Sequence, residues 1–153
     1  MLPKNRVVNK RIGKLLVERG IITSKQLEEA LTVQVEQEIH TKRRKLLGEI
    51  LIELGYASEE DVINSVTTQY GVPYLPIDSY EIDEDLIKTV PPDLVEKYEF
   101  LPIDKIGDLF TIAIADIPDT ETVAELEKSL KCKVEAFVCG PAALRKAIEK
   151  YYG

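Results

Sequence analysis

The sequence predicts an α+β fold: a helical N-terminal half made of two repeated α-hairpins, followed by a small α/β half with a three-stranded sheet. Two observations predict it. Residues up to about Gly71 show only helical periodicity, whereas residues 73–153 alternate short apolar runs with helical segments and hold seven of the eight prolines. We therefore expect a helical subdomain over residues 1–72 and an α/β subdomain over residues 73–153.

The first half begins with two amphipathic helices. Apolar residues recur three and four positions apart in each, at Ile12, Leu15 and Leu16 and at Leu27, Ala30 and Leu31. Gly20 is expected to end the first helix, because glycine readily takes the left-handed backbone conformation found there. Thr23 is the expected N-cap of the second helix, with Gln26 three residues later completing a capping box.

The same pattern occurs twice. Residues 11–34 (RIGKLLVERGIITSKQLEEALTVQ) align without gaps with residues 46–69 (LLGEILIELGYASEEDVINSVTTQ). The identical pairs are Gly13/Gly48, Leu16/Leu51, Glu18/Glu53, Gly20/Gly55, Thr32/Thr67 and Gln34/Gln69. Each copy is predicted to be a helix, a glycine turn, a cap and a second helix.

The second half has the alternation of short apolar runs and turn residues that is typical of a small sheet. Apolar runs at 100–103 and 109–114 flank a turn-like segment, which predicts a β-hairpin. A helix is expected at about 120–130, a strand near 133–138 and a helix from Pro141 to about Tyr151, whereas 82–98 reads as two short helices interrupted by Pro91-Pro92. This order predicts three strands with helices on one face of the sheet.

Composition excludes several classes of function. The 27 acidic against 20 basic residues give a net charge of −7, which disfavours DNA or RNA as a partner. With neither a signal peptide nor a long apolar run, a cytoplasmic protein without a transmembrane segment is expected. His40 is the single histidine and no Cys-x-x-Cys occurs, so no metal site is expected. No phosphate-binding loop or dinucleotide fingerprint occurs, so we expect neither an enzyme nor a cofactor.

The duplication has two interpretations. One is an α-hairpin repeat made only for packing, since the 35-residue offset is close to that of tetratricopeptide repeats. Packing explains the leucines and the turn glycines, but less readily Gly13/Gly48 or Gln34/Gln69. A glycine in the opening turn of a helix uncovers backbone N–H groups, which can receive an anion. Two such sites suit a two-fold symmetric ligand with two phosphates.

The two segments resemble the paired 24-residue motifs, R-L-G-x-x-L-x-x-x-G-x-x-x-x-x-x-L-x-x-x-L-x-x-Q, of the MshEN-type N-terminal domain of type II secretion and type IV pilus assembly ATPases. Ile12 replaces the leucine in the first copy, and the second begins Leu46-Leu47-Gly48. Leu101-Pro102-Ile103 and the run 112–119 resemble the later part of that domain. Some members of the family bind cyclic di-GMP, which makes this nucleotide the expected ligand.

The resemblance implies a role for each motif residue. Arg11 would meet a guanine edge, as an arginine fork pairs with guanine O6 and N7. Gly13 and Gly48 would let backbone amides approach the phosphates, and Gln34 and Gln69 would hydrogen-bond the ligand. The remaining expected ligand-site residues are apolar: Ile12, Leu16, Leu46, Leu47 and Leu51.

Two functions from different classes follow. The first is a non-catalytic cyclic di-GMP receptor domain, with a secretion or pilus ATPase domain or an inner-membrane platform protein as its partner. The second is a ligand-free docking module that attaches such an ATPase to its platform. A helix-turn-helix DNA reader fits the helix pairs but not the acidic charge.

Overall fold

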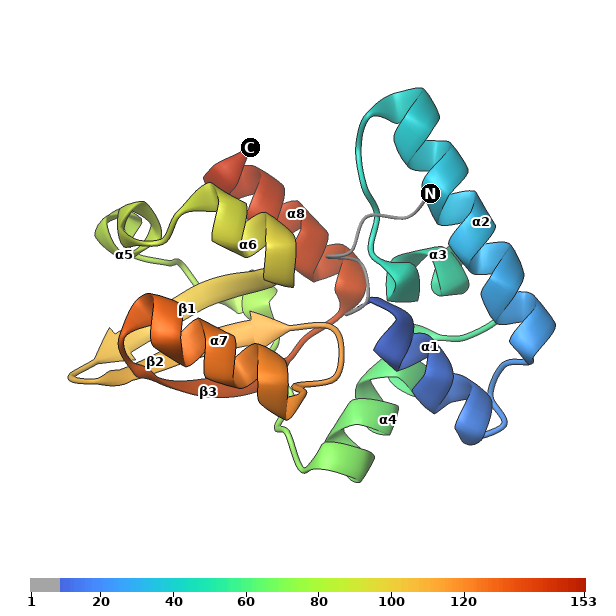
Figure 1. Cartoon of the computed structure of the whole chain (residues 1–153), viewed down its shortest axis with the longest axis horizontal. Helices are drawn as coiled ribbons and strands as arrows, with labels where there is room; N and C mark the ends of the chain where they lie inside the picture. Colours follow the sequence, from blue (N-terminus) through green and yellow to red (C-terminus); the bar gives the residue numbers. More distant parts are fainter. Residues whose placement is uncertain (1–8) are drawn as a thin grey trace.

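The computed structural model describes residues 9–153 and confirms the α+β fold (Figure 1). Four helices form the helical half: α1 (Asn9–Glu18), α2 (Ser24–Thr41), α3 (Leu47–Glu53) and α4 (Glu59–Tyr70). The mixed half contains η2 (Ile77–Ser79), α5 (Glu84–Thr89), α6 (Pro92–Tyr98), β1 (Phe100–Ile106), β2 (Leu109–Ile114), α7 (Thr120–Leu130), β3 (Lys133–Val138) and α8 (Pro141–Tyr152). No helix within residues 9–153 is both long and apolar enough to span a bilayer.

The repeated helix, turn, cap and helix are confirmed in both copies. Gly20 and Gly55 have φ values of 74° and 78°, a left-handed conformation that favours glycine. Thr23 and Ser58 then cap α2 and α4, each through a capping box with the residue three positions later. The same local chemistry therefore sets the angle between the two helices of each hairpin.

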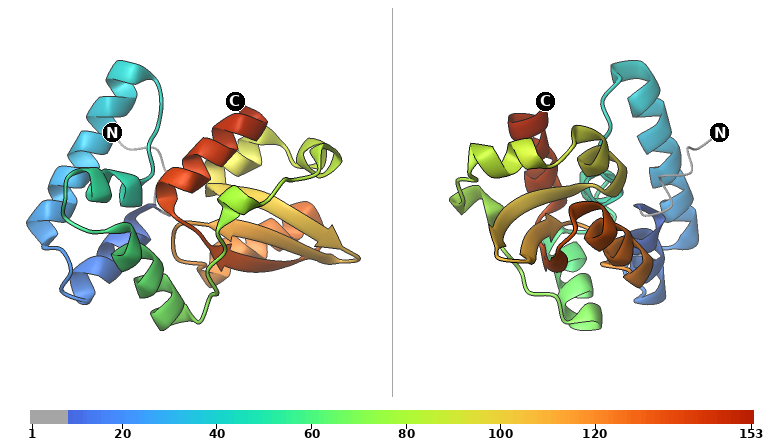
Figure 2. Two further views of the ribbon diagram at one scale, coloured as in Figure 1. Left: turned by 180° about the vertical axis from the view of Figure 1, so that it is seen from behind. Right: turned by 60° about the vertical axis from the view of Figure 1, so that its left-hand side comes forward.

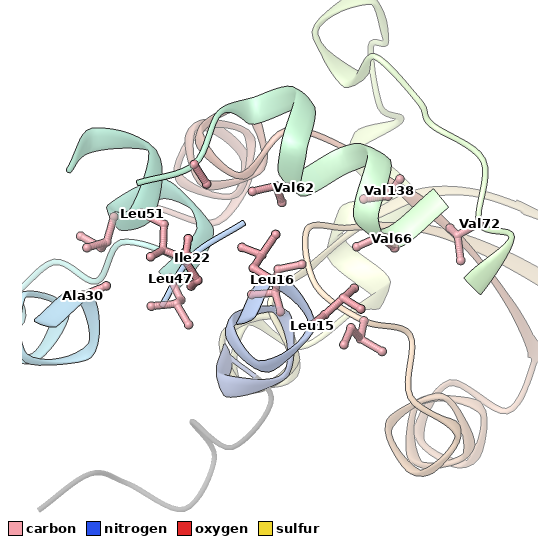
Figure 3. Close-up of a cluster of buried hydrophobic side chains, with 14 residues drawn as sticks. Leu15, Leu16, Ile22, Ala30, Leu47, Leu51, Val62, Val66, Val72 and Val138 are labelled. Atoms are coloured by element: carbon pink, nitrogen blue, oxygen red, sulfur yellow. The ribbon is translucent and has the colours of Figure 1, made fainter. Parts of the chain in front are cut away.

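The two hairpins close around one apolar cluster (Figure 3). α1 and α3, the first helices of the two copies, each pack against the other three helices of this half. These two helices therefore lie at its centre. The cluster includes Leu16, Leu47, Leu51, Val62 and Val66, all with no exposed surface. Val72, Ile117 and Val138 extend it into the segments that carry the sheet.

The sheet has the strand order β1-β2-β3, with β1 antiparallel and β3 parallel to β2. The predicted hairpin is therefore confirmed, and α7 supplies the crossover that a parallel pair requires. Pro102 lies in an edge strand, where its missing N–H costs least, and the register shifts directly after it.

Helices cover both faces of the sheet, so the prediction of helices on one face was wrong. Phe110 and Ile112 of β2 pack with Leu126 of α7, whereas Ala113, which points to the opposite face, packs with Leu144 of α8. Figures 1 and 2 show α7 and α8 on the two sides. The order of elements does not determine to which side a helix turns after the last strand.

A buried ion pair joins the two halves. Nε of Arg145 in α8 lies 2.9 and 2.8 Å from the two carboxylate oxygens of Glu49 in α3. The Glu49 side chain is only 5% exposed, and that of Arg145 is 20% exposed. Nη1 of Arg145 also donates to Glu149, at 3.0 Å. The start of the second motif is therefore fixed to the C-terminal helix.

We expect Arg145→Met to lower the free energy of unfolding by about 2 to 3 kcal/mol, because it leaves the Glu49 charge buried without its partner. Chemical denaturation measures this loss. Glu49→Met/Arg145→Met should lose less than the single variant, since it removes both charges. Lys45→Met is the matched control: its partner Glu53 is 41% exposed, so the loss should stay below about 1 kcal/mol. Equal losses for Arg145→Met and Lys45→Met would contradict the buried pair.

Candidate functional site

The starts of the two motifs meet at one place in the structure. Ile12 of α1 and Leu46, Leu47 and Gly48 at the start of α3 line the same small cavity of about 10 Å³. Its other lining residues come from the mixed half: Glu99, Ala115, Asp116 and Leu144. A cavity of this size holds at most about one water molecule. The motif starts therefore converge, but the space between them is closed.

Both motif glycines are positions of close packing. A Cβ atom at Gly13 would lie 2.4 Å from Cδ1 of Leu27 and 3.2 Å from Cδ2 of Leu47. A Cβ atom at Gly48 would lie 3.2 Å from Cγ of Pro141, at the start of α8. Close packing therefore offers an explanation of both glycines that needs no ligand.

The apolar motif residues lie in the core. Leu16, Leu47 and Leu51 are fully buried, Ile12 is 1% exposed and Leu46 is 8% exposed. Leu46 belongs to the cluster under α8, and the other four to the cluster of the helical half. In this conformation the cores of the two halves account for all five.

The two motif glutamines have different surroundings. Gln34 is 2% exposed, and its Nε2 donates to the backbone carbonyl of Lys45 at 2.7 Å. Gln34 therefore holds the segment that leads into the second motif, which is a packing role. Gln69 is exposed near the end of α4. The structure does not bring the two glutamines into equivalent contacts.

Arg11 reaches the loop that follows β2. Its Nε lies 3.5 Å from Oδ2 of Asp119, makes no hydrogen bond and is buried, whereas the side chain as a whole is 39% exposed. Asp119 is also the N-cap of α7 and accepts from the backbone N–H of Glu121 at 3.0 Å. Arg11 therefore connects α1 to the start of α7 while part of its side chain remains accessible.

Asp116 is the most perturbed acid of the site. Although the residue is partly exposed, protein atoms enclose its carboxyl group, and this desolvation raises its pKa well above the ordinary 3.8. Hydrogen bonds from the backbone N–H groups of Ile117 and Ile12 oppose the rise, whereas the nearby Glu99 carboxylate adds to it. Asp116 therefore places an acid at the start of α1, where the motif hypothesis expects an anion.

A cleft of about 390 Å³ opens beside Leu46. The basic segment Lys42–Arg44 lines it, together with Arg145, and so do the carboxylates Glu96, Glu99 and Glu149. Nη2 of Arg44 lies 2.7 Å from Oε1 of Glu99. Cations and carboxylates are therefore interspersed along this cleft.

Sequence reasoning missed the residues that come from the mixed half: Glu49's partner Arg145, and Glu99, Asp116 and Asp119. Arg145 is 96 positions from Glu49, a separation that no local pattern reveals. The run 112–119 did contain Asp116 and Asp119, but its resemblance to the family gave neither residue a role at the site. Among residues 9–153, no group of His, Cys, Asp and Glu side chains is arranged to hold a metal ion.

Comparison with known proteins gives one family. The model of the MshEN domain matches residues 70–153. The type IV pilus assembly ATPase PilB of Myxococcus xanthus (strain DK1622) is 30% identical over 142 residues, which are 93% of this chain. The chain spans only about a quarter (24%) of that relative's length.

Two solved structures have the same fold over nearly the whole chain. A structure of MshE with cdg is 31% identical, with a TM-score of 0.59, over 94% of this chain and 99% of the other. The N-terminal domain of XpsE has a TM-score of 0.63 over 100% of both chains, at 19% identity. The XpsE likeness concerns the fold alone.

We expect Asp116→Asn to be more stable than the unmodified chain near neutral pH. A raised pKa in the folded state means that the protonated acid stabilises the fold below about pH 3.8 and that this stability is lost as pH rises through the folded-state pKa. Asparagine imitates the neutral acid, so its advantage should grow with pH above about 4. Denaturation of both proteins between pH 3.5 and about 8 measures the difference.

Asp104→Asn is the matched control. Asp104 also accepts the next residue's backbone N–H, at 2.8 Å against 2.6 Å for Asp116, but it is exposed. Its substitution shows what the change from aspartate to asparagine does at an exposed site with the same local hydrogen bond. A stability difference for Asp116→Asn that stays constant across this range would contradict the buried acid.

Proposed function

The chain belongs to the MshEN domain family, and we propose that it is a receptor domain for cyclic di-GMP. The observation that carries this proposal is the meeting of the two motif starts around Ile12, Leu47 and Gly48. A two-fold symmetric dinucleotide needs two related contact sites close together. The MshE structure with cdg, which we read as cyclic di-GMP, supports the same ligand.

Two motif residues are exposed and could meet a ligand without rearrangement. Arg11 keeps 39% of its side chain exposed, and Gln69 is exposed. We propose that Arg11 pairs with a guanine edge and that Gln69 hydrogen-bonds the ligand, as the motif implies. Gln34 already donates to the backbone of Lys45, and the backbone at Gly13 and Gly48 is closely packed. These groups would contact the ligand only after a local rearrangement.

The closed cavity requires movement before a nucleotide can enter between the motifs. A dinucleotide is far larger than about 10 Å³. Its phosphates would also compete with Asp116 for the start of α1, because both are anions attracted to the same N–H groups. We propose that binding separates Asp116 from α1, exposing the apolar residues Ile12, Leu16, Leu46, Leu47 and Leu51 to ribose and base.

The proposed role is regulatory rather than catalytic. We propose that the domain is cytoplasmic, divides near residue 72, and transmits the state of the ligand to a pilus or secretion ATPase domain or to an inner-membrane platform protein. The pilus ATPase relative supports this context. No metal or cofactor takes part in the proposal.

A second candidate function is a docking module that binds no nucleotide. Its specific support is that neighbouring side chains already pack closely at Gly13 and Gly48, and that Gln34 already has a hydrogen-bond partner, all without a ligand. Completeness of the motifs favours the receptor, whereas this packing favours the docking module. Direct titration distinguishes them.

Calorimetric titration with cyclic di-GMP, with GTP and ATP as controls, tests the proposal. We expect one dinucleotide per chain, because both hairpins contribute to one site. Two independent sites per chain would contradict the paired site, and absence of binding would favour the docking module.

The contrast between Arg11→Ala and Lys14→Ala tests the guanine contact. Both remove one positive charge from α1, but Lys14 is exposed and has no ion pair with residues 9–153. A bidentate contact predicts a loss of about 1 to 3 kcal/mol of binding free energy for Arg11→Ala and much less for Lys14→Ala. Arg11→Lys should restore little, since lysine lacks the planar fork. Similar losses for both alanine variants would indicate general attraction of an anion instead.

A further inference from the structure

A groove of about 660 Å³ lies on the sheet between α5 and the far end of the β-hairpin. Its apolar lining residues are Leu75, Leu86, Ile103 and Phe137. Phe137 pairs with Ala113 across the sheet, on the face that α8 covers farther along. The groove is therefore the part of this face that α8 leaves open.

The rim of this groove is acidic. Glu81, Asp83, Asp85 and Asp104 line it, against one cation, Lys105. Asp83 and Asp104 each accept one local backbone N–H bond. In the described part of the chain, no ion pair engages any of the four carboxylates. Tyr80, 46% exposed, adds an aromatic ring to the lining. The groove thus combines an apolar floor with a field that attracts cations.

The C-terminal end of α2 has the complementary character. Ile39 is 68% exposed, and His40, Lys42 and Arg43 around it are exposed. Lys42 ends the helix with a φ of 59°. Neither Lys42 nor Arg43 forms an ion pair with any described residue. We call residues 39–43 the α2 tip.

The acidic groove and the α2 tip lie on different parts of the molecule. Figure 1 shows α5 and the hairpin at one end of the long axis, and the C-terminal end of α2 at the top of the view, in the other half of the molecule. Lys42 and Arg43 of the tip also line the cleft of mixed charge beside α6 and α8, whereas Ile39 and His40 do not line it. One copy can therefore offer its tip to a second copy while its own groove stays open.

We propose that the α2 tip of one copy docks in the acidic groove of a second copy, forming a head-to-tail assembly. Ile39 meets the apolar floor, and Lys42 and Arg43 meet the carboxylates of the rim. Because the contact joins two different surfaces, repetition produces a ring or an open chain rather than a two-fold dimer. Nothing in this contact requires a nucleotide, so it is independent of the proposed receptor function.

Sedimentation of the full 153-residue chain over a range of concentrations tests the assembly. The tip variant Ile39→Gln/Lys42→Gln/Arg43→Gln and the groove variant Glu81→Lys/Asp85→Lys should each weaken self-association by at least about tenfold. Added salt should weaken the unmodified assembly. The control Lys25→Gln/Lys128→Gln removes two exposed lysines elsewhere and should leave it unchanged. Circular dichroism verifies that every variant is folded.

Mixing the two variants gives the sharpest result. The tip variant keeps an intact groove and the groove variant keeps an intact tip, so an equimolar mixture should form heterodimers and go no further. An unmodified chain that stays monomeric throughout, self-association that survives in either variant, or a mixture that forms no dimer would overturn the proposal. If the chain stays monomeric yet its groove binds a basic peptide, the groove serves another protein and the self-assembly is wrong.

Discussion

The close approach of α1 and α3 depends on positions that carry no side chain. At Gly13 a Cβ would lie only 2.4 Å from a methyl group of Leu27, and at Gly48 it would lie 3.2 Å from the ring of Pro141. A side chain at position 13 would require Leu27 to turn away, and one at position 48 would require the Pro141 ring at the start of α8 to shift. The core of the helical half and the pairing of Arg145 with Glu49 lie on either side of this contact.

Elements with strong local signals could be predicted from the sequence. Residues 120–130 and 133–138 form the expected helix and strand, because Asp119 caps the helix and the apolar run of the strand ends near Gly140. The side of the sheet on which α8 packs could not be predicted, because no local pattern encodes it. The repeat made it possible to predict that the two motif starts lie near each other. Asp116, the acid beside them, could not be predicted because it comes from a loop distant in the sequence.

Charge around the start of α1 is balanced rather than positive. Arg11 lies by Asp119 and Arg44 by Glu99, while Asp116 faces Ile12. A dianionic ligand in a chain of net charge −7 therefore gains little from long-range attraction. Its recognition would depend on short-range hydrogen bonds and on moving these carboxylates, which links binding to the contact between the two halves.

The spacer between the two motifs, residues 35–45, is mostly helix. α2 runs from Ser24 to Thr41, so only a few residues separate it from Leu46. With 18 residues, α2 is a stiff rod about 27 Å long. A tilt of about 10° at its capped end would move its free end by about 5 Å, by lever geometry alone. A slight change in the packing of α1 that tilts α2 would thus move the C-terminal end of α2 far enough to alter its contact with a neighbouring molecule.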